Sequence, residues 1–286
     1  MAITNFISTI WSETLYRKLN AEYVAVKNCS REFEGSILGQ GSTVKILGVG
    51  DITVSDYAKN TDMASPSALT DNARSLTINR AKAFNFLIDD VDHAQAAPGL
   101  MELAMEQAAA ALADEADKYV FSLYSGVTAE NTVTDAAVTV DSILDDVIAA
   151  REKLLANGVG GSIPTVLEVS PEIAAILLKA KILNSTDNDG AVSNGAIGSL
   201  IGFEVYVSPN VAVSTSDKSN KCFARTKRAI AFAEQLNSVE AYRPELRFAD
   251  GVKGLHLYGA KIIYPDEIVL LNLTKKTTTT TNTGSN

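Results

Sequence analysis

The chain has 286 residues, of which 46% are hydrophobic, 21% are charged and 7% are aromatic. This is the composition of a globular protein with a packed core, and it excludes a wholly disordered or collagen-like chain. The formal net charge of -9 argues against a protein that grips nucleic acid by neutralising its phosphates. Two cysteines and two histidines leave little material for a disulfide framework or a zinc site.

The first twenty residues place apolar side chains at helical spacing and not in one continuous run. This stripe predicts an amphipathic helix and consists of Phe6, Ile7, Ile10, Trp11, Leu15 and Leu19. It lacks the basic flank and unbroken apolar core of a signal peptide, and no apolar run in the chain is long enough to span a bilayer. We therefore expect a protein without a membrane segment that stays in the cytoplasm of the cell that makes it.

The segment 41–89 alternates polar and apolar residues in the manner of β-strands, with a polar excursion in its middle. The alternation is clear over 41–47 and again over 75–89, while Ser, Ala and Asp surround Pro66. Too few large apolar residues are consecutive for an independent core. We predict two long strands that form an extended β-arm and find their partners elsewhere.

Pro98 opens the clearest predicted helix, which ends at Gly126. Its apolar positions recur every three or four residues, at Met101, Met105, Ala108, Leu112, Ala116, Tyr119 and Leu123. The other face of this helix carries Asp114, Glu115, Asp117 and Lys118. The stripe is either a partner-binding face or a core-packing face, and packing is the default interpretation of such spacing.

The middle of the chain alternates helical and strand-like segments, which is typical of a compact α/β unit with its own core. We predict loops over 126–141 and 183–199. The predicted elements are helices 142–156 and 170–178 and strands 165–170, 202–208, 222–224 and 229–233. The chain becomes strand-like again over 238–248 and 262–273, and residues 275–286 are a threonine-rich tail that we predict to be disordered.

The most enzyme-like group of residues is Asp89, Asp90, Asp92 and His93. Close carboxylates could share a proton or hold a divalent cation, with the histidine as a base. The alternative is that they are solvated turn and capping residues ahead of the Pro98 helix, and we favour this interpretation.

The other candidate motifs do not match the patterns of a calcium loop, a dinucleotide-binding site or a nucleophilic active site. Asp187-Asn-Asp-Gly190 would have Ser185 and Ala196 where a calcium loop needs acidic ligands. The glycines of 158–163 follow a helix and predict a C-cap, not a dinucleotide site. Nothing near Cys29 or Cys222 points to nucleophilic catalysis. We therefore predict no catalytic, cofactor-binding or metal-binding residue.

Several blocks spread along the chain carry a resemblance to a known family. The longest is VEAYRPELRFADGVKGLHLYGAK at 239–261, and the others are MAITNFISTIW at 1–11, GVGDITVSDY at 48–57, FNFLIDDVD at 84–92 and AEQ at 233–235. The sequence resembles the major capsid proteins of tailed bacteriophages with the Hong Kong 97-type fold, in the branch of the coat-protein-like siphophage capsids.

This resemblance implies an α+β fold with a definite division of the chain. The expected parts are an N-terminal arm (1–35), an extended β-loop (36–85), a peripheral domain (86–139 and 233–274) with a spine helix at about 98–125, an axial domain (140–232) and the disordered tail (275–286). In this family the arm and the loop reach onto neighbouring subunits, and the axial domains gather around symmetry axes.

The function that the resemblance implies is structural. The subunit would assemble through pentamers and hexamers into an icosahedral phage head that encloses double-stranded DNA without sequence-specific binding. A separate scaffolding protein, a portal and a decoration protein are the implied partners. Assembly would take place in the host cytoplasm. Lys45 and Lys59 lie where some relatives cross-link, although their position alone does not support that chemistry.

Three alternatives remain open at this stage. The same fold could form an encapsulin-type compartment. A soluble acidic enzyme could use the cluster from Asp89 to His93 with a divalent cation. A small-molecule binding module could occupy 140–232, against which the low aromatic content counts.

Overall fold

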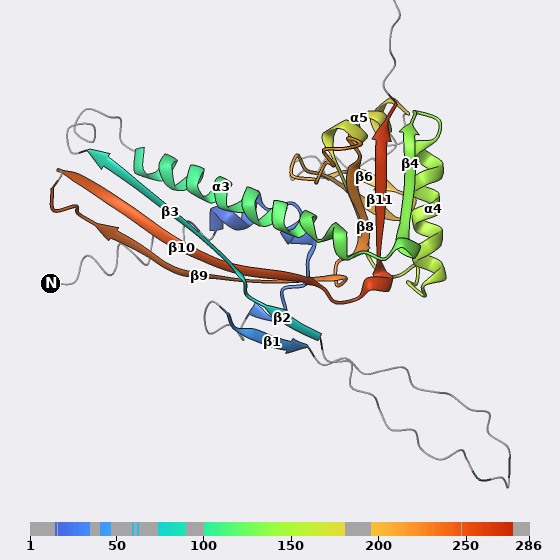
Figure 1. The fold of residues 1–286 in the computed structure, drawn as a ribbon, viewed down its shortest axis with the longest axis horizontal. Coiled ribbons are helices and arrows are strands. Elements are labelled where there is room, and N and C mark those ends of the chain that lie inside the picture. Colours follow the sequence, from blue (N-terminus) through green and yellow to red (C-terminus); the bar gives the residue numbers. More distant parts are fainter. Residues whose placement is uncertain are drawn as a thin grey trace, which may run out of the picture.

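The computed structural model describes residues 15, 17–34, 41–46, 59, 62, 74–89, 100–180, 196–246 and 248–276. These residues form an elongated molecule in which a long helix and a three-stranded sheet extend from a compact α/β unit (Figure 1). Several predictions lie outside the described residues: the start of the N-terminal arm, most of the extended loop, and the threonine-rich tail.

The predicted long helix is confirmed as α3, Leu100–Ser122, which continues into the 3-10 turn η3, Leu123–Gly126. Its apolar stripe packs into the main core, with Leu112 and Ala116 both buried. The stripe therefore serves packing within the subunit. One residue of the opposite face departs from the pattern, because Asp117 is buried with only 1% of its surface exposed.

A three-stranded antiparallel sheet lies along α3 in the order β3-β10-β9 (Figure 1). Its strands are β3, Arg80–Asp89; β10, Ala249–Ile262; and β9, Ile230–Tyr242. The register between β10 and β9 shifts at a bulge between Leu255 and His256. Phe84 of β3 lies over Gly254 of β10, where any Cβ would clash with its ring.

A short antiparallel pair, β1 (Thr43–Ile46) and β2 (Arg74–Thr77), lies beside the end of this sheet (Figure 1). Its apolar side chains share a small separate core with the long strands, formed by Val44, Ile46, Leu76, Ile78, Ala231, Ala233, Leu257 and Ile263. The described part of segment 41–89 therefore packs on other strands of the same chain, and a partner from a neighbouring subunit stays a prediction. The second predicted strand, 75–89, is divided into β2 and β3 at Ile78 and Asn79.

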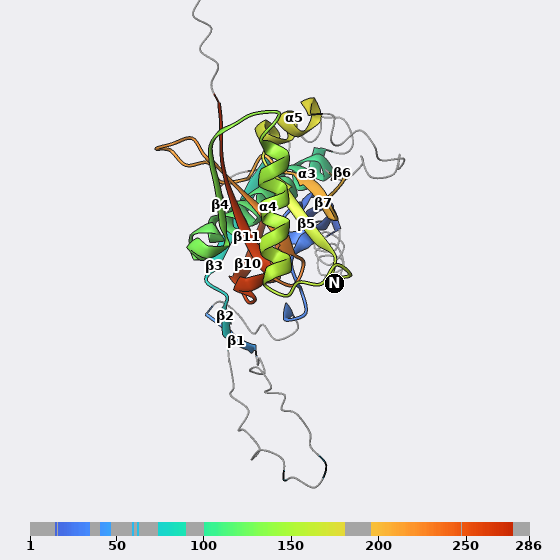
Figure 2. The ribbon, with the colours of Figure 1, turned by 90° about the vertical axis from the view of Figure 1, so that its right-hand side faces the viewer.

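The α/β unit is built on a six-stranded sheet with the order β4-β11-β8-β5-β7-β6. Its strands are β4, Thr132–Val138; β11, Ile268–Lys275; β8, Asn220–Thr226; β5, Thr165–Val169; β7, Phe203–Val207; and β6, Ala196–Leu200. The predicted helices are confirmed as α4, Ile143–Ala156, and α5, Pro171–Lys179. In Figure 2, α4 lies in front of the sheet, beside β4 and β11, and it contacts β4, β8 and β11.

Two predicted loops contain strands that the sequence did not predict. β4 lies within 126–141, and β6 begins within the predicted loop 183–199, at Ala196. Both are edge strands of the six-stranded sheet. β4 is only partly covered and has no run of large apolar residues, so the sequence carries little strand signal there.

The six-stranded sheet also changes the expected division of the chain. β4 and β11 were grouped with the long helix, within 86–139 and 233–274, but both pair inside the sheet of the α/β unit. The parallel pairing of β11 with β4 joins segments more than 130 residues apart, which local sequence patterns cannot reveal. Phe121 of α3 stacks on Phe223 of β8, with ring centroids 5.8 Å apart, and connects the long helix to this unit.

Candidate functional site

The described part of the N-terminal arm, 17–34, is fixed to the body of the molecule by buried carboxylates. The first is Asp117 of α3, which accepts hydrogen bonds from the backbone N–H groups of Val24, Ala25 and Val26 at 2.9, 3.1 and 3.0 Å. Burial raises the pKa of this carboxyl to about 6, although the three N–H groups act to lower it. The residue therefore satisfies backbone donors that would otherwise be buried without partners.

The second carboxylate is Glu168 of β5, which forms a fully buried ion pair with Arg225 of β8. The guanidinium donates from Nε to Glu168 Oε2 at 3.0 Å and from Nη2 to Oε1 at 2.8 Å. It also donates to the carbonyl oxygens of Asn28 at 2.6 Å and Ala25 at 3.1 Å. Because a buried charge must be paired and hydrogen-bonded, this arrangement holds the arm against the six-stranded sheet.

The third carboxylate, Glu234 of β9, holds the arm to the long sheet. It accepts hydrogen bonds from Tyr23 and Arg31 of the arm, and His256 Nε2 lies 2.8 Å from its Oε2. Burial acts to raise the pKa of Glu234, but His256, Arg31 and Tyr23 together keep it below its usual value. The arm, β9 and β10 therefore meet at one buried cluster of polar and charged side chains.

These three carboxylates bind segments of the same chain. Each has partners on the arm, and the arm thereby contacts α3, the six-stranded sheet and the long sheet. The arrangement fixes the described part of the arm in place, which is a structural task.

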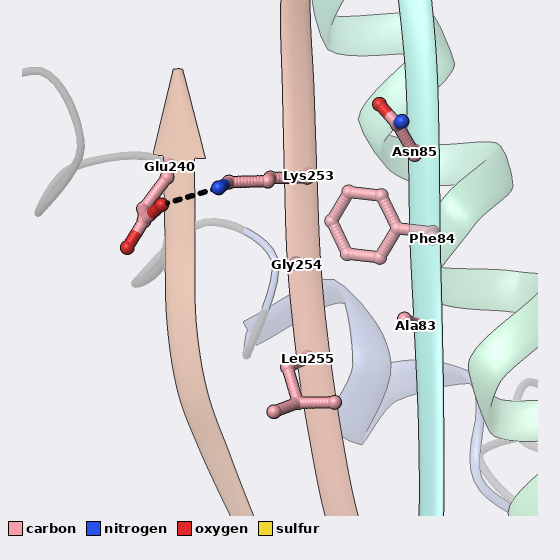
Figure 3. Close-up of a pocket in the computed structure, with 7 residues that line it drawn as sticks. All are labelled: Ala83, Phe84, Asn85, Glu240, Lys253, Gly254 and Leu255. Atoms are coloured by element: carbon pink, nitrogen blue, oxygen red, sulfur yellow. Dashed lines mark ion pairs between the residues drawn. The ribbon is translucent and has the colours of Figure 1, made fainter. Parts of the chain in front are cut away.

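Away from β1 and β2, the face of the long sheet opposite α3 has a shallow depression of about 380 Å³, and Figure 3 shows the residues that line it. Lys253 of β10 and Glu240 of β9 form an ion pair at 2.8 Å beside the Phe84 ring. Nearby, the Tyr242 hydroxyl donates to Asn85 Oδ1 at 2.8 Å. Both charged side chains are more than half exposed, so the pair contributes little to stability. The face resembles a contact surface more than a ligand cavity.

The edges of both sheets are a second feature suited to contacts between subunits. In the described part of the chain, the edge strands of the long sheet are β3 and the half of β9 nearest the β9–β10 turn. The edge strands of the six-stranded sheet are β4 and β6. Edge strands offer unpaired backbone groups to other chains. β3 has Arg80 and Lys82 exposed along its edge, a pattern that discourages non-specific pairing.

The acidic cluster from Asp89 to His93 stays untested, because most of it lies outside the described residues. Asp89 is the last residue of β3 and lies opposite Ala249, whereas Asp90, Asp92 and His93 are not described. The calcium-like segment 185–190 also lies outside the described ranges, while Ala196 begins β6. Within those ranges, no three His, Cys, Asp or Glu residues gather in a way that could hold a metal ion.

The other singled-out residues have structural positions. Gly158 has a φ of 85° directly after α4, which confirms the predicted C-cap. Burial raises the pKa of Cys29 and Cys222 to about 12, which leaves both thiols protonated near neutral pH. Lys45 is exposed on β1, and Lys59 is exposed as well.

Sequence reasoning missed Asp117, Glu168, Arg225 and Glu234. The signal that could have found three of them is a charged residue within or directly after an apolar strand run: Glu168 in TVLEV, Arg225 after Cys222-Phe-Ala, and Glu234 in IAFAEQ. A charge at such a position is buried with a partner or faces solvent, and only tertiary structure decides between these outcomes. Asp117 gave no such signal, because it lies among other charged residues.

A comparison with protein families matches residues 72–271 to the family described as phage capsid protein. The chain belongs to this family. A comparison with curated proteins finds no match. None of the helices in the described part of the chain combines the length and hydrophobicity needed to cross a bilayer.

Solved structures agree with the family. A structure from Mycobacterium phage Che8 is 27% identical, with a TM-score of 0.68 over 87% of this chain and 91% of that one. The capsid of cyanophage P-SCSP1u is 16% identical, with a TM-score of 0.64 over 84% and 85% of the two chains. A virus-like particle from Pyrococcus furiosus is 13% identical, with a TM-score of 0.58 over 95% and 100%.

These findings confirm the α+β, Hong Kong 97-type fold and the function of a major capsid protein. The protein is a component of the virion and assembles into a shell of many subunits. Its role is structural. The encapsulin alternative has less support, because the matching family model is that of phage capsid proteins.

Proposed function

We propose that this capsid protein assembles through pentamers and hexamers into an icosahedral head that encloses double-stranded DNA. The observation that carries the proposal is that two parts of the chain, expected to reach onto neighbouring subunits, are anchored to the body through their described residues. One is the N-terminal arm, anchored by Asp117, Arg225 and Glu234. The other begins and ends at the β1–β2 pair. Segments fixed in this way suit repeated contacts with neighbouring subunits, and such heterologous contacts close into rings.

The two sheets correspond to two proposed domains. The long sheet with α3 would form the peripheral domain, with α3 as its spine helix. The six-stranded sheet with α4 and α5 would form the axial domain at the five-fold and six-fold axes. Because β4 pairs with β11 and β11 pairs with β8, we include both strands in the proposed axial domain.

The proposed partners are those of a phage head. They include a separate scaffolding protein, a portal and a decoration protein, with assembly in the host cytoplasm. The net charge of -9 supports a wall that repels packaged DNA and leaves the genome free to move. We expect no binding of the free subunit to double-stranded DNA at physiological salt.

Negative-stain electron microscopy with sedimentation velocity tests the proposal. The purified protein would be examined over a range of concentrations with a crowding agent, and after co-expression with the phage's scaffolding protein. We expect rings, capsomers or closed shells. A subunit that stays monomeric under all of these conditions would contradict the proposal.

A further inference from the structure

The turn between β9 and β10 carries two large apolar side chains in solvent. Leu246 is 97% exposed and Phe248 is 81% exposed, whereas the next most exposed large apolar residue of the described chain, Leu103, reaches 56%. A pair of such residues at the end of a long hairpin does not stabilise the isolated subunit. Exposed apolar groups of this kind mark a surface that another molecule covers.

A groove between α3 and β3 offers an apolar site for such residues. It has a volume of about 620 Å³. Phe86 and Ile88 of β3 line one side, and Leu103, Ala104 and Ala108 of α3 line the other. The small alanine side chains leave room beside Phe86, whose ring stacks on that of Phe84 at 6.1 Å between centroids.

The turn and the groove lie at the same end of the molecule, where β3 ends and α3 begins (Figure 1). Ala249 pairs with Asp89, so Phe248 lies just beyond the end of β3. Its exposure of 81% means that it does not fill the groove of its own subunit. One end of the subunit therefore presents both an apolar projection and an apolar groove. Copies that meet at this end can each insert the projection into a neighbour and close a ring.

The charges around the two features are complementary. The turn Arg243-Pro-Glu-Leu-Arg-Phe248 has two arginines and one glutamate, and Arg243 also pairs with Asp250 of β10, 3.7 Å away. The rim of the groove is acidic, because Glu106 of α3 and Glu22 of the arm lie beside Leu103. Lys18 pairs with Glu106, and Glu22 carries the remaining negative charge of this rim. Opposite charges at such a contact favour one register.

We propose that Leu246 and Phe248 of one subunit insert into the groove between α3 and β3 of a second copy of this chain. This inference rests on the proposed shell function and specifies one contact within it. Burial of a Phe side chain removes about 150–250 Å² from water, which makes Phe248 the expected anchor of the contact.

Cysteine cross-linking tests the contact directly. Cys29 and Cys222 are buried, so thiols introduced by Phe248→Cys and Leu103→Cys would be the reactive ones. Particles co-assembled from the two single variants, carrying different tags, should give a mixed disulfide dimer on oxidation. Particles of either variant alone should stay monomeric on a non-reducing gel. The matched control pairs Leu103→Cys with Val213→Cys, a residue 54% exposed on the α/β unit, and should not cross-link.

Two cross-linking results would overturn the contact. Dimers of Phe248→Cys with itself would indicate a head-to-head arrangement of the turns. Well-formed particles without the mixed dimer would assign the groove to another occupant, such as the neighbour's N-terminal arm or a decoration protein.

Replacing the two apolar side chains with charged ones tests this contact separately from the shell function. The double variant Leu246→Asp/Phe248→Asp should raise the protein concentration needed for assembly by at least about tenfold, since anchors of this kind dominate interfaces. Its melting temperature should match that of the wild type, because both side chains are exposed in the subunit. Val213→Asp serves as the control and should assemble normally. Unchanged assembly of the double variant would overturn the contact alone, whereas a wild type that never assembles would overturn the shell function as well.

Discussion

The two sheets of this capsid protein bury their strands in different ways. β5, in the six-stranded sheet, is buried at every one of its five positions, and β8 is buried at six of seven. β3, in the long sheet, has Lys82, Ala83, Asn85 and Leu87 exposed. A sheet covered on both faces carries its own core, whereas the end of the long sheet away from β1 and β2 has α3 on one face only and leaves the other face for other molecules. The subunit therefore joins a self-contained unit to an extension whose free surfaces suit contact with neighbours.

The N-terminal arm connects these two regions through buried charges. Its backbone carbonyls accept from Arg225 of the six-stranded sheet, and its side chains reach Glu234 of the long sheet. Substitutions in the self-contained unit should therefore cost the most stability, and substitutions on the open face should cost the least.

The largest effect is expected from Arg225→Met. The substitution leaves Glu168 buried without its partner and removes the donors to Asn28 and Ala25. Loss of one member of a buried pair costs about 3–5 kcal/mol of unfolding free energy, measured by urea denaturation. The double variant Arg225→Met/Glu168→Met should recover part of this loss. A loss below about 1 kcal/mol for the single variant would mean that the pair does not stabilise the unit.

The next effect concerns pH. An aspartate in an unfolded chain has a pKa of about 3.9, and burial raises the pKa of Asp117 to about 6 in the folded protein. The native state therefore binds this proton more tightly than the unfolded state. Protonation of Asp117 therefore adds up to about 3 kcal/mol to the free energy of unfolding. This contribution is complete below about pH 4 and is lost as the pH rises through about 6.

Denaturation of wild type and Asp117→Asn at several pH values between about 4 and 7 measures this contribution. The difference in unfolding free energy between the two proteins should change through this window in favour of wild type at lower pH. A difference that stays constant across the window would show that Asp117 does not titrate there.

A smaller effect is expected from Gly254→Ala in the long sheet. The added Cβ would clash with the Phe84 ring, so the ring must move from its stack with Phe86. Overpacking of this kind costs about 1–3 kcal/mol. The double variant Gly254→Ala/Phe84→Leu should be more stable than Gly254→Ala alone. If the single variant unfolds at the wild-type temperature, the Phe84 ring does not pack over this glycine as described.

The smallest effect is expected on the open face of the same sheet. Lys253→Ala removes the exposed ion pair with Glu240 and should change the unfolding free energy by less than about 1 kcal/mol. Glu240→Ala is its matched control and should behave alike. A loss comparable to that of Arg225→Met would mean that the open face contributes to the core after all.

The elements with strong local patterns were predictable from the sequence. The spacing of Met105, Leu112 and Ala116 indicates α3, and Ser170-Pro171 marks the start of α5, where the Ser170 side chain accepts a hydrogen bond from the Ile173 N–H. β4 was missed because it has no strong alternation of its own and exists through its pairing with β11.

The anchor of the arm was not predictable, for a related reason. Asp117 belongs to a run of charged residues on α3, and nothing local distinguishes it from Asp114. Its burial depends on the arm, nearly a hundred residues earlier, which supplies three backbone N–H groups. Long-range partners of this kind decide which charge is buried, and a single sequence does not contain them.

Backbone hydrogen exchange of assembled particles against the free subunit is the most direct test of the contrast between the two sheets. We predict that assembly slows exchange along β3 and in the turn at 243–248, while β5, already buried in the subunit, exchanges equally slowly in both states. Slowing confined to the six-stranded sheet, with β3 and the turn unchanged, would contradict this contrast.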